Sequence, residues 1–114
     1  MHLVHVIVNP LDEVYETRAL PPLQVVDAAE AKAYALLREV AERCLPETVT
    51  RVLHVRHGDA YEKIRAVADE IRPDLIVVST HGRGGIAHLV IGSVAEKIVR
   101  HAPCPIFVVP RRQA

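Results

Sequence analysis

Four short runs of aliphatic, mostly β-branched residues constrain the fold of this chain more than any other feature. They lie at residues 3–8, 48–55, 75–78 and 106–109, and longer segments with helical periodicity separate them. Leu75 to Val78 is apolar throughout, which is typical of a parallel strand that is covered on both faces. This alternation predicts an α/β fold, in which helices cover both faces of an open, three-layer parallel sheet with right-handed crossovers.

Helices are predicted between these runs. Asp27 is the predicted N-cap of a helix that ends near Arg43, and residues 11–26 before it form a long connector. The apolar positions of this helix approximate one stripe: Ala28, Ala31, Ala35, Leu36, Val40 and Ala41. Asp59 is the predicted N-cap of the next helix, over residues 60–71. Its predicted core face consists of Ile64, Val67, Ala68 and Ile71.

Composition limits the class of protein. A chain of 114 residues, half of them hydrophobic, fits one domain over residues 1–114. Fourteen basic and fourteen acidic side chains leave no basic excess for nucleic acid. Two cysteines are too few for a disulfide framework. Residues 1–10 lack the pattern of a signal peptide, and no apolar run reaches the length of a membrane span. We therefore expect a cytoplasmic protein without a membrane partner.

The segment after the third run has the composition of a phosphate-binding loop. Glycines stand at positions 82, 84 and 85, and Gly92-Ser93 opens a predicted helix that ends near Arg100. Glycine lets a ligand approach the backbone closely, and a helix N-terminus offers free N–H groups, here including those of Val94 and Ala95. The Walker pattern is absent, because no lysine follows these glycines at the required spacing. The composition fits equally well a plain strand-to-helix turn with Ser93 as its cap.

Three stretches resemble the C-terminal half of a universal stress protein: residues 75–85, 92–97 and 100–105. Nucleotide-binding members of that family carry G-x-x-G, nine residues, and then G-[ST]. Gly82, nine residues and then Gly92-Ser93 follow this pattern, with Ser79 in place of the first glycine. The middle of the chain matches more loosely, at residues 57–60. The resemblance implies a fold like that of the adenine nucleotide alpha hydrolases.

The resemblance also implies a ligand and a partner. The ligand would be ATP or AMP, with Mg²⁺ as a candidate companion ion. Val78, Ser79 and Gly82 would lie along the ribose, whereas Gly92, Ser93, Val94 and Ala95 would hold phosphates, and the backbone of Val6 would meet the adenine. The implied partner is a second copy, paired through the last strand from Ile106 to Val109, because an exposed strand edge needs a neighbour or a cover.

The sequence departs from the family pattern at its start. Family members begin with a strand and helix that precede the run at residues 3–8; that strand lies at the middle of the sheet and carries an Asp near its end. Residues 1–114 contain no equivalent Asp, because Asp12 and Asp27 fall in the wrong segment. Three explanations stay open: a shortened N-terminus, a sheet that closes around the missing strand, or a strand supplied by another chain. The alternative function is a dimerisation or scaffold module that binds no nucleotide.

Other polar residues do not combine into a site. His54 and His57 would point to opposite faces of a strand, so we predict no metal site from them. Ser79, Thr80 and Ser93 lie near His81 in the sequence, but the loop has no carboxylate to orient that histidine. We therefore predict no catalytic residues, and slow ATP hydrolysis is an open alternative that the resemblance brings.

Overall fold

The computed structural model describes residues 1–8, 23–79 and 93–110, and its elements alternate between strand and helix as predicted. They are β1 (His2–Ile7), α2 (Leu23–Cys44), β2 (Val52–His57), α3 (Ala60–Ile71), β3 (Ile76–Ser79), α4 (Ser93–His101) and β4 (Ile106–Val109). The strands pair in parallel, β1 with β2 and β3 with β4, which confirms the α/β fold class. The chain divides into two compact units, Met1–Lys63 and Ile64–Ala114. The single domain over 1–114 stays a prediction.

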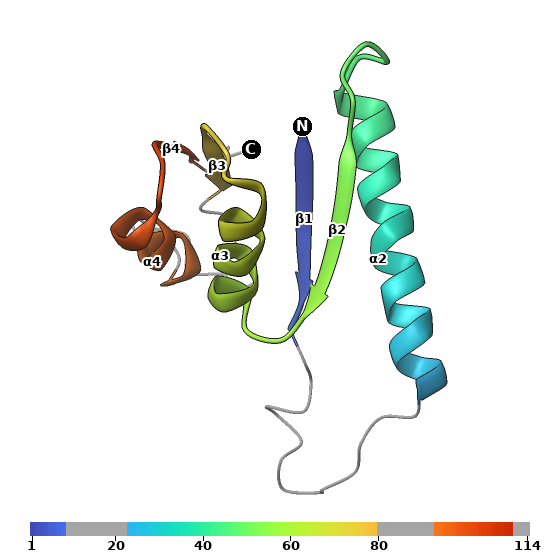
Figure 1. Ribbon diagram of the computed structural model, residues 1–114. Helices are drawn as coiled ribbons and strands as arrows, with labels where there is room; N and C mark the ends of the chain where they lie inside the picture. The colour runs from blue at the N-terminus through green and yellow to red at the C-terminus, as the bar shows by residue number, and fades with distance from the viewer. Residues whose placement is uncertain (9–22, 80–92, 111–114) are drawn as a thin grey trace, which may run out of the picture. The chain divides into compact units, whose positions relative to one another are not determined.

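The sheet of the first unit consists of β1 and β2, side by side in Figure 1. The Met1 carbonyl accepts a hydrogen bond from the Val52 N–H (2.9 Å), and the Ile7 carbonyl accepts one from the Gly58 N–H (3.1 Å). Backbone groups alternate between the two edges of a strand, so odd-numbered residues of β1 face β2. The even-numbered residues Val4 and Val6 therefore present their N–H and C=O groups to the opposite edge. No described strand pairs with that edge.

Helix α2 lies along this sheet and contacts both of its strands (Figure 1). It begins at Leu23, so the prediction that Asp27 caps it is wrong. Pro21-Pro22 directly precedes Leu23 in the sequence, and proline is tolerated only at or before the first turn of a helix. The chain can therefore become helical immediately after the prolines, which places Asp27 inside the helix.

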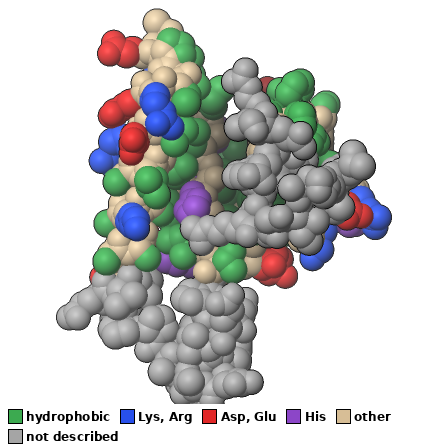
Figure 2. All heavy atoms as spheres, turned by 180° about the vertical axis from the view of Figure 1, so that it is seen from behind, with side chains coloured by type: hydrophobic (Ala, Val, Ile, Leu, Met, Phe, Trp, Pro, Cys, Tyr) green, Lys and Arg blue, Asp and Glu red, His purple; other side chains and the backbone are tan. Residues whose placement is uncertain are grey.

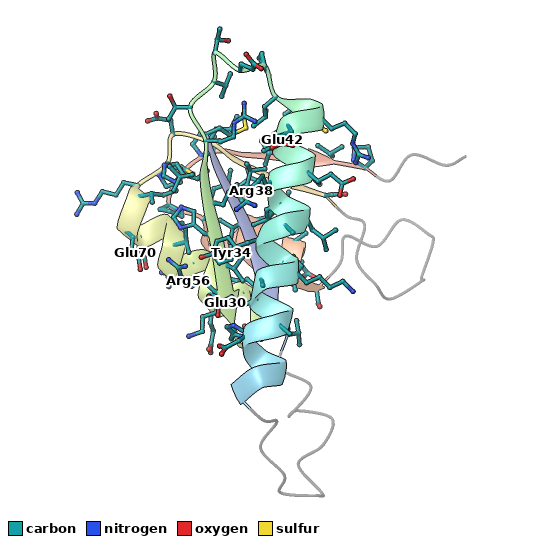
Figure 3. The ribbon with its side chains drawn as sticks, turned by 90° about the vertical axis from the view of Figure 1, so that its right-hand side faces the viewer. Glu30, Tyr34, Arg38, Glu42, Arg56 and Glu70 are labelled. Atoms are coloured by element: carbon teal, nitrogen blue, oxygen red, sulfur yellow. The ribbon has the colours of Figure 1, made fainter. Side chains whose placement is uncertain are left out.

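The predicted apolar stripe of α2 is also wrong. The side chains of Leu36 and Val40, which belong to the predicted stripe, are 51% and 38% exposed. Ala41 is the member of the predicted stripe that is buried. The buried line instead passes through Ala33 and Ala41, with the half-buried Leu37 between them. Alanines occur all around this helix, so the sequence contrast between its faces is small. Hydrophobic and charged side chains are accordingly interspersed over its outer surface (Figure 2). Side chains at four-residue spacing from Glu30 to Glu42 follow one another along it (Figure 3).

Strand β2 begins later than the predicted run at 48–55. A turn precedes it, in which the Val49 N–H donates to the Pro46 carbonyl (3.0 Å). Thr48 and Val49, the β-branched residues at the start of the predicted strand, therefore belong to this turn and not to β2. The strand then continues to His57, which is two residues beyond the predicted end.

Helix α3 has the predicted bounds and the predicted cap. The Glu62 N–H donates to Asp59 Oδ2 (2.9 Å), and the Lys63 N–H donates to the Asp59 carbonyl (3.0 Å). Gly58, before the cap, has a φ of 129°, a conformation that only glycine adopts readily. At the other end, Arg72 has a φ of 46°, and its N–H donates to the Ala68 carbonyl (2.8 Å). Arg72 therefore ends the helix in the left-handed conformation that glycine usually supplies.

The buried face of α3 is the predicted one. Val67 and Ala68 are buried, and Ile64 and Ile71 are half-buried. Among the helices that the structure describes, none is long and apolar enough to cross a membrane.

The sheet of the second unit has one half-buried face and one exposed face. Ile76 lies opposite Ile106, and Ser79 lies opposite Val109. Val77 and Phe107 are register partners and are 60% and 58% exposed, whereas the residues on either side of them are half-buried. Side chains alternate between the faces of a strand, so the exposed ones share a face. An apolar sheet face in this unit is therefore open to solvent.

Candidate functional site

Strand β3 carries Ser79 at its carboxyl end, the end at which open parallel sheets bind ligands. The Ile76 N–H donates to the Pro105 carbonyl (3.1 Å), so Ile76 and Val78 face β4. The backbone of Ser79 consequently faces the edge of β3 that β4 does not occupy, and its side chain is exposed. Val78 is half-buried, and its backbone groups face β4.

Helix α4 begins at Ser93, as the glycine pattern predicts. The first N–H groups of a helix have no carbonyl partner within it, and here they belong to Ser93, Val94 and Ala95. Ser93 is exposed, Val94 is half-buried, and the Ala95 side chain is buried. Ala95 can therefore offer a ligand its backbone alone.

The predicted site extends beyond the described residues. Gly82 and Gly92 lie outside them, as do the glycines at 84 and 85 and His81. Of the predicted phosphate ligands, the structure places Ser93, Val94 and Ala95 together in the first turn of α4. It places the predicted ribose contacts Val78 and Ser79 at the end of β3.

One acidic side chain lies close to the start of α4. Glu96 Oε1 forms an ion pair with Arg100 Nη2 at 2.9 Å, one helical turn away. Both side chains are more than half exposed, so the pair contributes little to stability. The pair matters more for a bound anion, because Arg100 offsets the negative charge of a carboxylate that would otherwise repel an anion at the N-terminus of α4.

Val6 lies in the first unit, near the carboxyl end of β1. The odd-numbered residues of β1 form the hydrogen bonds with β2. The N–H and C=O of Val6 therefore face the opposite edge, with which no described strand pairs. This orientation is the one that a backbone contact with a planar base needs. Within their own sheets, Val6 and Ser79 thus share two properties: a position near the carboxyl end of a parallel strand and a backbone that faces an edge with which no described strand pairs.

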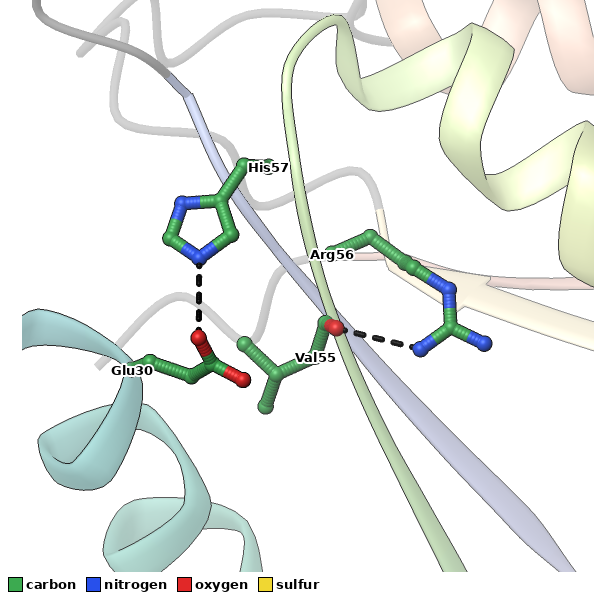
Figure 4. A network of polar contacts seen from close by, with 4 residues as sticks. All are labelled: Glu30, Val55, Arg56 and His57. Carbon is green, nitrogen blue, oxygen red and sulfur yellow. Dashed lines mark hydrogen bonds and ion pairs between the residues drawn. The ribbon is translucent and has the colours of Figure 1, made fainter. Parts of the chain in front are cut away.

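The histidines of β2 point to opposite faces, which confirms the prediction. His54 is buried, and its Nε2 lies 2.8 Å from Nδ1 of His2, with the two rings stacked 5.1 Å apart. His57 Nε2 lies 3.4 Å from Glu30 Oε2 on α2 (Figure 4). Arg56, between them in the sequence, donates to the Val55 carbonyl (3.1 Å). The described residues contain no group of three metal-ligating side chains.

The pair of His2 and His54 is the polar contact that sequence reasoning missed. A hydrogen bond between two imidazoles requires one ring to donate and the other to accept, so at least one of the two is neutral. The contact depends on the register of β1 against β2, which sets His54 opposite Val4. The even spacing of His2 and Val4 then places both histidines on the same face.

Comparisons with known proteins agree with the observed fold. Residues 1–110 match the model of the universal stress protein family. Two solved structures are similar to this chain: hypothetical protein MJ0577, with a TM-score of 0.80 and 20% identity, and hypothetical protein PH0823, with a TM-score of 0.75 and 22% identity. The similarity covers 99% and 98% of this chain, and 76% and 75% of the respective neighbours. The comparison with curated proteins gave no match. At these identities the structures support the fold alone.

Proposed function

Because the chain belongs to the universal stress protein family, we propose that it binds ATP or AMP as a small stress or signalling module. The observation that carries this proposal is the start of α4 at Ser93, directly after the glycine-rich segment. The free N–H groups of Ser93, Val94 and Ala95 provide donors for phosphate oxygens, and the helix dipole favours the negative charge. The Ser93 hydroxyl is exposed and adds a further donor.

The rest of the nucleotide would lie along the open strand edges. Ser79 and Val78 at the end of β3 are the proposed ribose contacts, and the backbone of Val6 is the proposed adenine contact. A base that pairs with a backbone N–H and C=O needs those groups to be turned away from a neighbouring strand, and Val6 fulfils this condition.

Isothermal titration calorimetry with ATP, AMP and adenosine tests this proposal. We expect ATP and AMP to bind and adenosine to bind more weakly, because it has no phosphate. Ser93→Ala should weaken ATP binding about 10- to 150-fold, the value of one lost hydrogen bond to a charged group, about 1.5–3 kcal/mol. Thr48→Ala, an exposed hydroxyl in the turn before β2, is the matched control and should bind as the wild type. A folded wild-type protein that does not bind ATP at millimolar concentration would refute the proposal.

We further propose that the protein forms a homodimer through β4. This strand pairs with β3 on one edge, and Phe107 and Val109 present apolar side chains on an exposed face. Pairing with a second copy would cover part of this surface and would give the backbone N–H and C=O groups along the outer edge of β4 hydrogen-bond partners. Phe107→Glu should convert the dimer into a monomer in light scattering, whereas the same substitution at Leu36, an exposed apolar residue of α2, should leave it dimeric.

The same exposed face favours a second candidate function, a dimerisation or scaffold module without a nucleotide. Val77 and Phe107 are register partners, and both apolar side chains are exposed on the same face of the sheet. The calorimetry above separates the two candidates, because a scaffold module would dimerise through β4 and show no heat with ATP.

A further inference from the structure

Two imidazole rings meet at the amino end of the β1–β2 sheet. Nδ1 of His2 lies 2.8 Å from Nε2 of His54, and the rings are stacked with their centroids 5.1 Å apart. His54 is 9% exposed, whereas His2 is exposed. One ring is therefore shielded from water, and the other can take up a proton directly.

The contact depends on the number of protons that the pair carries. A hydrogen bond between imidazoles needs one nitrogen with a proton and one without, so it persists when both rings are neutral or when one is charged. When both rings are charged, every ring nitrogen is a donor, and the two that face each other at 2.8 Å repel. The closed pair therefore excludes a second positive charge, whereas two separated histidines both become charged below about pH 6.5.

The positive charges near the pair oppose a second positive charge on it. Arg56 lies two residues beyond His54 on β2, so the two side chains share a face of the strand. Arg56 accordingly extends away from His57 in Figure 4. The amino group of Met1 donates to the Thr50 carbonyl (2.7 Å) at the same end of the sheet.

The carboxylates described in the first unit lie elsewhere. Helix α2 covers the other face of the sheet, where Glu30 contacts His57 (3.4 Å). Asp59 and Glu62 belong to the start of α3, which follows the opposite end of β2. Glu47, in the turn before β2, is exposed, so water and salt screen its charge.

We propose that His2 and His54 form a pH-sensitive latch between the amino end of β1 and β2, which is closed near neutral pH and opens on acidification. Opening takes up one further proton, so the stability of the closed latch falls as the pH falls. The ratio of open to closed latch should rise up to about tenfold for each pH unit below about 6.5. The latch does not involve the proposed nucleotide contacts, since Val6 lies near the other end of β1.

Amide hydrogen exchange, measured by NMR, tests the latch at single hydrogen bonds. The Val52 N–H donates to the Met1 carbonyl (2.9 Å) beside the pair, and the Gly58 N–H donates to the Ile7 carbonyl (3.1 Å) at the other end of the two strands. Between about pH 6.5 and 5.5, we expect the protection factor of the Val52 amide to fall about fivefold and that of Gly58 to change less than about twofold. EDTA in all samples keeps metal ions from bridging the two rings.

Two matched variants identify the cause of this fall. His2→Asn removes the titrating ring but keeps a donor and an acceptor at that position, so it should abolish the fall at Val52. His5→Asn, the same substitution on the opposite face of β1, should retain it.

Three results would overturn the proposal. The first is a wild-type protein in which the protection factor of Val52 does not fall between about pH 6.5 and 5.5. The second is an equal fall in His2→Asn, which would assign the effect to the burial of His54 alone. The third is an equal fall at Val52 and Gly58, because the two strands would then separate as a whole instead of opening at the pair.

Discussion

Gly58→Ala tests whether backbone conformation or side-chain space fixes the turn between β2 and α3. Gly58 has a φ of 129°, a region that is essentially restricted to glycine, and forcing another residue into it costs about 1–3 kcal/mol. A Cβ at this position would also lie 2.9 Å from Cε of Lys63. The contacted atom is near the end of a flexible side chain, so it can move at small cost. We therefore expect the backbone strain to dominate.

The expected loss of stability follows from two opposing effects. Alanine reduces the conformational entropy of the unfolded chain, which favours the variant by about 0.4–1 kcal/mol. The net destabilisation should then be about 1–2 kcal/mol. With an m-value of about 1.5 kcal/mol/M, the urea midpoint should fall by about 1 M. Far-UV circular dichroism is the suitable probe, because the chain has no tryptophan.

A double-mutant cycle with Lys63→Ala decides between the two causes. If strain dominates, removing the Lys63 side chain should restore less than about 0.5 kcal/mol of the loss. Lys63→Ala alone measures the effect of that side chain in the presence of glycine. A double variant that regains most of the stability would show that the clash with Lys63, rather than φ, is the cause, and would refute the reasoning.

Three further substitutions have effects that urea titration can measure. Asp59→Ala should destabilise the protein by about 1 kcal/mol, because the Glu62 N–H loses its cap; Asp59→Asn, which keeps an acceptor, should recover most of this. Arg72→Gly should stabilise it by about 1 kcal/mol, because the left-handed conformation is cheap for glycine, and Arg72→Ala should give no such gain. Glu30→Gln should change stability by less than about 0.5 kcal/mol, since the 3.4 Å contact with His57 is more than a third exposed; a loss above 1 kcal/mol would contradict this.

The sequence predicts the bounds of a helix well where a capping residue precedes it and a helix-breaking residue follows it. Asp59 before α3 and Pro73 after it mark both ends, and the observed helix has the predicted bounds. The start of α2 was predicted wrongly because Asp27 was preferred as its cap over the prolines directly before Leu23, and its stripe was predicted wrongly because its alanines hide which face is buried. The start of β2 was misplaced because Thr48 and Val49 have strand propensity but belong to a turn closed on Pro46. Local composition cannot reveal a hydrogen bond of that kind.

In the candidate site, too, the sequence predicts local features but not those that depend on how the strands pair. The start of α4 at Ser93 follows from the glycine spacing and is confirmed. The direction of the Val6 backbone cannot be read from the sequence, because it depends on which residues of β1 bond to β2. The contact of His2 with His54 likewise requires the register of two strands that are far apart in the chain. Nucleotide contacts at Gly82 and Gly92 stay predictions.

The parallel pairing of β1 and β2 also bears on the order in which the chain folds. Residue 2 pairs with residue 52, a separation of 50 residues, whereas residue 76 pairs with residue 106, a separation of 30. The longer loop costs about 0.5 kcal/mol more in closure entropy, and non-local pairing of this kind is slow. During synthesis, β1 is made before β2 and must wait for it. For that interval β1 lacks β2 as its strand partner, so a growing chain is exposed to misassembly with its neighbours at this strand.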